Sequence, residues 1–292
     1  MSVEPLTVEP KSVAPEPAGH LLVDAPPVAA PVPAPVPAAR RPRGNPPWVL
    51  LYHSVAEDPY HITVSPGRLD RQLRWLRDRG LRGVSVDALL RSRAAGRGTG
   101  LVGLTFDDGY ADFLSDALPL LRRHDCTATV FVMPGRAGGD NAWDPLGPRK
   151  PLLTEDGIRA VADAGMEIGS HGLLHQDLTT ADGVTLVRET AVSRALLTEL
   201  TGRAPEGFCY PYGAVDTRAV EAVRGAGYGY ACAIDPGPLT GLLALPRVHI
   251  GAADTSWRLH LKRLLHPLRR RPLPEESTPT TSTADPAAGG TL

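Results

Sequence analysis

The chain has 292 residues, of which 42% are hydrophobic, and its 31 basic side chains nearly balance 32 acidic ones. This balance gives no electrostatic reason to expect nucleic acid or an anionic membrane as the main partner. Residues 1–47 hold 13 of the 30 prolines and residues 267–292 hold five more, and neither segment has an aromatic residue. Segments so poor in large side chains cannot offset the entropy of ordering. We therefore expect disordered tails at 1–47 and 267–292 around one domain, residues 48–266.

The N-terminal segment and the cysteines bear on where the protein works. The first 20 residues contain three Glu and no long apolar run, so they do not resemble a signal peptide, and no stretch long enough to span a membrane occurs. The three cysteines, Cys126, Cys209 and Cys232, are an odd number without metal-binding spacing. We expect them to be small buried side chains. These features predict a cytoplasmic protein.

Within the domain, short apolar runs alternate with helical patterns. The runs that predict strands are residues 48–53, 101–106, 128–132, 166–170, 207–212, 228–234 and 243–250. The helical patterns cover residues 66–79, 111–123, 154–164, 182–201 and 216–226. Such alternation is typical of parallel strands joined by right-handed helical crossovers. We predict an α/β fold, an irregular (β/α) barrel of about seven parallel strands.

Polar side chains gather where these strands end. Asp107 and Asp108 follow the second predicted strand and His171 follows the fourth. Tyr212 closes the fifth, and His249 lies in the last. In barrels and open α/β sheets, catalytic groups collect at the carboxyl ends of the strands. The sequence therefore predicts a functional site at that end.

The residue types at this site point to a metal. His171 and His175 are four residues apart and would meet on one face if the segment turned helically. The adjacent carboxylates of Asp107 and Asp108 repel each other unless a cation or a proton is shared. A metal held by two histidines and one Asp would keep open positions, and the second Asp could act as a base toward water.

Three motifs carry a family resemblance. They read Thr105-Phe106-Asp107-Asp108-Gly109-Tyr110, Ser170-His171-Gly172-Leu173-Leu174-His175-Gln176-Asp177-Leu178 and Phe208-Cys209-Tyr210-Pro211-Tyr212-Gly213. With these motifs, over about residues 48–250, the sequence resembles the polysaccharide deacetylase family, the carbohydrate esterases with a NodB homology domain. The opening run of residues 51–55 is similar to the poly-N-acetylglucosamine deacetylase branch.

The resemblance implies a role for each matching residue. Asp108, His171 and His175 would bind a divalent metal, most often Zn²⁺, and Asp107 would be the general base. The backbone N–H of Tyr212 would stabilise the oxyanion. A late histidine, for which His249 is the candidate, would protonate the leaving amine. The expected substrate is an N-acetylated saccharide or glycoconjugate, and the products are acetate and a free amine.

Two departures from the family pattern matter. Cys209 stands where much of the family has an Arg that steadies the base, and we predict that Arg247 supplies this cation. The fourth family motif is not recognisable around residues 230–235, so His249 is open to a second interpretation as an ordinary rim histidine. Four other polar or aromatic residues are candidates for a role in the cleft or in its loops. His53 and His61 either line the cleft or are polar loop residues, Trp143 either stacks on a sugar or anchors its loop, and Asp177 is expected to cap the next helix.

Two rival functions are considered. A mononuclear iron oxygenase could use His175, Asp177 and His249, but that site normally belongs to a jelly roll, which the alternation of helices and strands disfavours. A carbohydrate-binding module could keep the barrel without its chemistry. The retained Asp107 argues against it, because binding alone needs no base beside the metal.

The last apolar pattern lies at residues 257–265 and is followed by three consecutive arginines, residues 269–271. A basic amphipathic helix of this kind can make peripheral contact with a membrane surface. The pattern is more typical of a final helix that packs on the barrel and leaves its basic face in water. We therefore treat membrane contact as the weaker of the two hypotheses.

Overall fold

The computed structural model describes residues 47–58 and 60–269. The predicted tails, residues 1–47 and 267–292, lie outside this part of the chain apart from residue 47 and residues 267–269. Their disorder therefore stays a prediction, and so do the domain limits that depend on it.

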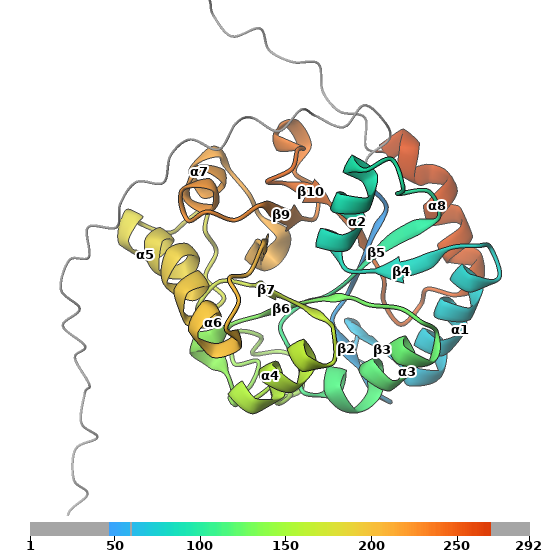
Figure 1. Cartoon of the computed structure of the whole chain (residues 1–292). Helices are drawn as coiled ribbons and strands as arrows, with labels where there is room; N and C mark the ends of the chain where they lie inside the picture. The colour runs from blue at the N-terminus through green and yellow to red at the C-terminus, as the bar shows by residue number, and fades with distance from the viewer. Residues whose placement is uncertain (1–46, 59, 270–292) are drawn as a thin grey trace, which may run out of the picture. The chain divides into compact units, whose positions relative to one another are not determined.

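In the described residues, nine parallel strands form one sheet that is nearly closed into a barrel (Figure 1). The order along the sheet is β10-β9-β8-β7-β6-β5-β1-β11, and β4 also pairs with β5. The bounds are β1 Val49–Tyr52, β4 Arg82–Val84, β5 Leu101–Phe106, β6 Thr129–Val132, β7 Glu167–Ser170, β8 Gly207–Cys209, β9 Tyr230–Ala233, β10 Leu245–Pro246 and β11 Val248–His249. A separate pair, β2 Ser54–Val55 and β3 Thr63–Val64, follows β1. The predicted (β/α) barrel is confirmed.

The barrel closes at one residue, Arg247. Strand β10 pairs with β9, where Pro246 is opposite Ala233, and β11 pairs with β1, where Val248 is opposite Leu50. Arg247 alone separates β10 from β11, so the chain passes there from one end of the strand order to the other. The closure thus places Arg247 between the two edges of the sheet.

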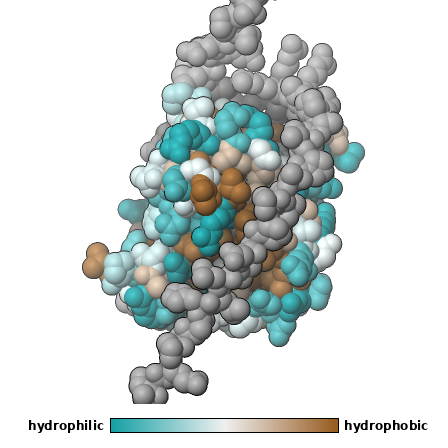
Figure 2. Space-filling view, turned by 90° about the vertical axis from the view of Figure 1, so that its left-hand side faces the viewer, coloured by the Kyte–Doolittle hydropathy of each residue, from teal (hydrophilic) through white to brown (hydrophobic). Residues whose placement is uncertain are grey.

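Helices surround the strands (Figure 1). Their bounds are α1 Pro66–Arg77, α2 Val86–Ala94, α3 Leu118–Arg123, α4 Glu155–Asp163, α5 Gly183–Val187, α6 Ser193–Thr201, α7 Thr217–Gly225 and α8 Ser256–Arg269, with single π turns η1 Phe113–Ala117 and η3 Arg188–Val192 and 3₁₀ turns η2 Pro134–Arg136, η4 Pro211–Gly213 and η5 Gly237–Leu239. The side of the barrel that carries α5 and α6 is mostly hydrophilic, although Val184 and Val187 are exposed there (Figure 2).

The sequence missed or merged several elements. Strand β4 and helix α2 were not predicted. Strand β4 is three residues long, begins with the exposed Arg82 and contains a glycine, so it lacks the apolar run that predicted the other strands. The predicted strand at 243–250 is two short strands on different neighbours. The predicted helix at 182–201 is present but contains the π turn Arg188–Val192. Cys126, Cys209 and Cys232 are buried and unpaired with one another, as expected.

The C-terminal helix α8 packs on the barrel through its buried Leu259 and His266. Its exposed side includes Trp257 and Leu264, which are 66% and 57% exposed. The helix therefore packs as expected, but its outward face is apolar as well as basic, and contact with a membrane surface stays a prediction. None of the helices in the described ranges is long and apolar enough to cross a bilayer.

Candidate active site

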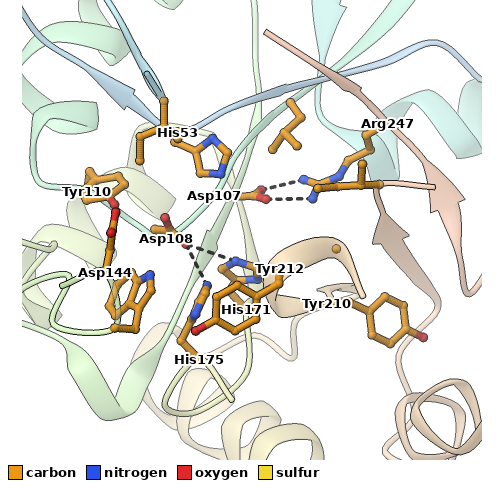
Figure 3. Close-up of a pocket in the computed structure, with 15 residues that line it drawn as sticks. His53, Asp107, Asp108, Tyr110, Asp144, His171, His175, Tyr210, Tyr212 and Arg247 are labelled. Carbon is orange, nitrogen blue, oxygen red and sulfur yellow. Dashed lines mark hydrogen bonds and ion pairs between the residues drawn. The ribbon is translucent and has the colours of Figure 1, made fainter. Parts of the chain in front are cut away.

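A cavity of about 230 Å³ opens at the carboxyl end of the barrel (Figure 3). The ends of β1, β5 and β7 supply His53, the pair Asp107–Asp108, and His171 to its wall. Most of the residues that the sequence placed at this end therefore line one cavity. Most of the wall is formed by ionisable and aromatic side chains, and Leu51, Ile62 and Ile234 add aliphatic surface.

The three predicted metal ligands meet in this cavity. Asp108 Oδ1 lies 3.2 Å from His171 Nε2 and 3.4 Å from His175 Nε2, and all three side chains are buried. Ligand atoms about 2.1 Å from a tetrahedral ion lie about 3.4 Å from one another. One carboxylate oxygen and two imidazole nitrogens at this spacing fit a divalent metal such as Zn²⁺.

The two histidines come together without the helical turn that we expected. Residues 171–175 form a loop in which Gly172 and His175 both have left-handed backbones, with φ of 83° and 67°. Asp108 is also left-handed, with φ of 69°. Non-glycine residues adopt this conformation at a cost of about 1–3 kcal/mol and do so mainly at functional sites. Local backbone strain at two of the three ligands therefore belongs to the site.

His171 is oriented by the strand next to its own. Its Nδ1 is 2.9 Å from the backbone oxygen of Cys209, which directs Nε2 toward Asp108. Burial alone would raise the pKa of Asp108, but hydrogen bonds to His171 and His175 hold that pKa well below its usual range. The carboxylate is thus kept ionised as a ligand.

His175 is held by rings instead. The Trp143 ring stacks on it at a centroid distance of 4.6 Å, and the Tyr212 ring meets it edge-on at the same distance. The Arg136 guanidinium lies 5.2 Å from the Trp143 centroid, and its Nε donates to the oxygen of Leu174. Among the described residues His175 Nδ1 has no hydrogen-bond partner. Trp143 therefore contacts a metal-ligand candidate directly, a role that the sequence did not suggest.

The predicted base has the predicted cation beside it. Arg247 binds both oxygens of Asp107, at 2.7 and 2.8 Å, and also donates to Cys209 Sγ at 3.0 Å. Asp107 and Arg247 are at most 3% exposed. Burial opposes ionisation, but Arg247 and then His171 outweigh it and lower the pKa of Asp107. The small Cys209 leaves room for this guanidinium where the family's Arg would stand, so the cation reaches the base from the closing strand.

The two candidate histidines for proton donation lie differently. His53 lines the cavity, whereas His249 is exposed and is not part of its wall. Their ring centroids are 5.8 Å apart. Burial lowers the pKa of His53, although Asp108 and Asp107 act in the opposite direction. The sequence signal for His53 was its place directly after the first strand, the same signal that identified Asp107 and His171. His61 is exposed and outside the wall.

The remaining predicted residues are placed as follows. Tyr212 lies at the cavity with a left-handed backbone, φ of 60°, and an exposed ring, while its N–H as an oxyanion donor stays a prediction. Asp177 does not cap the next helix, because its carboxylate accepts from Thr179 N in a local turn while Asp182 caps α5. Tyr110, which the sequence gave only as part of a motif, hydrogen-bonds Asp108, and burial with that charge raises its pKa.

A (β/α) barrel with a buried Asp-His-His cluster beside a second buried carboxylate is an arrangement that suits a hydrolase. Sequence comparison agrees: a family model described as polysaccharide deacetylase matches residues 95–231. Residues 95–231 therefore match the polysaccharide deacetylase family, and this match with the relatives supports a deacetylase-type hydrolase.

Individual relatives extend this match. The protein YxkH of Bacillus subtilis (strain 168), whose name assigns it to the polysaccharide deacetylases, is 27% identical over 207 residues, 69% of this chain and 70% of its own. A poly-beta-1,6-N-acetyl-D-glucosamine N-deacetylase of Staphylococcus aureus (strain N315) is 19% identical, covering 65% and 68%. The solved structure of Streptococcus pyogenes deacetylase PplD with acetate has a TM-score of 0.65 at 24% identity, covering 74% and 97%, and shows the shared fold.

Proposed function

We propose that this protein is a metal-dependent N-deacetylase that hydrolyses the acetamido group of an N-acetylated saccharide to acetate and a free amine. The observation that carries the proposal is the pairing of two adjacent carboxylates with opposite partners. Asp108 faces His171 and His175, and Asp107 faces Arg247. One carboxylate is thus free to bind a metal while its neighbour is free to take a proton.

The metal would be held by Asp108, His171 and His175. A divalent ion there supplies Lewis acidity, which makes water nucleophilic near neutral pH and polarises a carbonyl. The structure supports this donor set by its spacing and by the Cys209 carbonyl that fixes the His171 ring. Asp107, His171 and Cys209 also offer ligand atoms close together, but Arg247 already binds Asp107 and Cys209 and supplies a positive charge there.

The chain's own residues divide the proton transfers. Asp107 is ionised and accepts a proton from the attacking water, while Arg247 holds both of its oxygens and so fixes the direction of the free lone pairs. The N–H of Tyr212 would donate to the oxyanion. The leaving amine must then gain a proton. His53 lines the cavity and is neutral at rest because its pKa is lowered, so it would take over the water proton from Asp107 and donate it to the amine.

The substrate class follows from the relatives and the cavity. The relatives' names include poly-beta-1,6-N-acetyl-D-glucosamine and chitin as substrates of those proteins. The apolar side chains Leu51, Ile62 and Ile234 line the same cavity as the charged groups and suit the acetyl methyl and the sugar faces. An N-acetylglucosamine unit, in a polymer or in a smaller conjugate, is therefore the proposed substrate.

Acetate release tests the proposal. Zinc-loaded protein is incubated with chitooligosaccharides, poly-N-acetylglucosamine and small N-acetylglucosaminyl conjugates, with Asp107→Asn as the matched inactive control. The expected result is acetate from at least one substrate with the wild type and far less with the variant. A metal-loaded wild type that releases acetate from none of them contradicts the proposal.

A further inference from the structure

Glu189 is a buried acid on the outer layer of the barrel that the proposed chemistry does not use. It lies in the π turn η3 between α5 and α6, and only 1% of the residue is exposed. Its carboxylate accepts from Leu173 N at 2.8 Å and from Leu174 N at 3.1 Å. These two N–H groups belong to the loop that joins His171 to His175.

The surrounding residues are arranged to let this carboxylate reach the loop. A Cβ on Gly172 would collide with Glu189 Oε2 and displace this carboxylate, and the φ of 83° at Gly172 also favours glycine. One turn further along the helix, Ser193 Oγ donates to the oxygen of Gly172 at 2.8 Å. The backbone of the loop is therefore bonded to the helix at its start and at its middle.

Glu189 lies in the only π turn of this helical stretch, which joins α5 to α6 in the described part of the chain. Single π turns inside α-helices are rare and occur frequently at functional sites. Here the π turn lies at the residue that contacts the loop, while the α-helical parts on either side pack normally. Hydrogen bonds from backbone N–H groups to an ionised carboxylate are among the stronger ones in proteins.

The two metal-ligand histidines differ in what holds them. His171 has a hydrogen bond on Nδ1, whereas His175 Nδ1 has none within the described part of the chain. His175 is also left-handed, so its direction depends on the loop that precedes it. From this contrast we infer that Glu189 is a positioning residue: by fixing residues 173 and 174, it holds His175 toward Asp108 and sets the affinity of the metal site. This inference depends on the proposed function only in taking the group bound by Asp108, His171 and His175 to be a divalent metal.

Metal affinity is the first test. Glu189→Gln keeps the size of the side chain and Glu189→Ala removes it, while Glu199→Gln changes an exposed acid on the same helical stretch and is the control. Zn²⁺ dissociation constants are measured by chelator competition. We expect about 10–100-fold weaker binding for the Ala variant, as for other partners of metal ligands, a smaller loss for Gln, and no change for Glu199→Gln.

Hydrogen exchange in the metal-free protein is the second test and does not depend on the metal. The amides of Leu173 and Leu174 should exchange faster in Glu189→Gln than in the wild type, with the thermal midpoint of the metal-free protein little changed. Unaltered zinc affinity in the folded Gln and Ala variants, or unaltered exchange at these amides, overturns the inference. A wild type that binds no zinc overturns the proposed function instead, and the exchange result still decides the role of Glu189. If the Ala variant does not fold, the Gln variant carries both measurements.

Discussion

At the carboxyl end of the barrel, Asp107 and Asp108 lie among cationic and imidazole groups, whereas at the amino end Glu167 lies among hydroxyls. Glu167 is the first residue of β7, and its carboxylate accepts from Thr129 Oγ1 at 2.6 Å and from Tyr230 OH at 2.8 Å. The two ends thus hold their acids with different partners. The acids at both ends lie at the termini of parallel strands.

Because their partners differ, the acids at the two ends of the barrel have pKa values shifted in opposite directions. Arg247 and the histidines lower the pKa values of Asp107 and Asp108 against the effect of burial. Burial raises the pKa of Glu167, and its hydrogen bonds do not compensate fully. Charge is therefore maintained at the end that holds the proposed base and metal ligand, whereas the amino end of such barrels generally contributes to stability.

The largest expected effect is loss of the ligand at the charged end. Asp108→Asn removes the anionic donor that faces both histidines, so zinc binding and acetate release should both fall by about 1,000-fold or more. Chelator competition and an acetate assay measure the two losses. Asp177→Asn is the control, since its carboxylate serves a local turn. Retention of zinc by Asp108→Asn and its loss in Asp177→Asn would instead support the oxygenase alternative.

The two histidines near the carboxyl end of the barrel, His53 and His249, should differ in proton donation to the leaving amine. His53→Gln should lower kcat by about 100-fold or more with zinc affinity unchanged, because a cavity-lining donor is lost. His249→Gln should change kcat by less than about threefold, because the exposed His249 is outside the cavity wall. Steady-state kinetics on zinc-loaded proteins provides the comparison. A larger loss for His249→Gln would restore His249 as the acid.

The ion pair at the charged end should also matter for stability. Arg247→Met leaves Asp107 buried without its cation, and breaking a buried pair costs about 3–5 kcal/mol. Urea unfolding measures this, with Arg258→Met on the exposed side of α8 as the control. We expect a kcat loss of about 10-fold or more as well, since the direction of the base is no longer fixed. Stability equal to the control would show that the pair contributes little.

The smallest effect is expected at the amino end. The pKa of Glu167 is higher in the folded than in the unfolded chain, so its contribution to stability is full below the unfolded pKa and is lost as the pH rises through the folded value. Glu167→Gln removes this titration. Its thermal midpoint should exceed that of the wild type at pH 8, the difference should shrink toward pH 5, and kcat should not change. A difference independent of pH would contradict this assignment.

Short-range patterns explain what sequence reasoning found and missed. Asp107, Asp108 and His171 follow strong apolar runs, so their place at the site could be predicted. Arg247 was proposed only because Cys209 broke the family pattern, and His249 was preferred to His53 because the family resemblance implies a late histidine as the acid. The π turn around Glu189 could not be predicted, since the residues of 182–201 have an ordinary helical pattern and the bond partners lie in a loop about 15 residues away in sequence.

The sequence by itself determined the alternation of strands and helices and indicated the proposed ligands and base, because apolar periodicity and motif spacing are local properties. Tertiary structure decided which of several polar residues reach the cavity. Barrel closure at Arg247 brings a cation to Asp107 from 140 residues away, and the left-handed loop at 171–175 turns two histidines toward one carboxylate. These contacts depend on how distant strand ends meet around a closed sheet, which the spacing of residues along one strand does not specify.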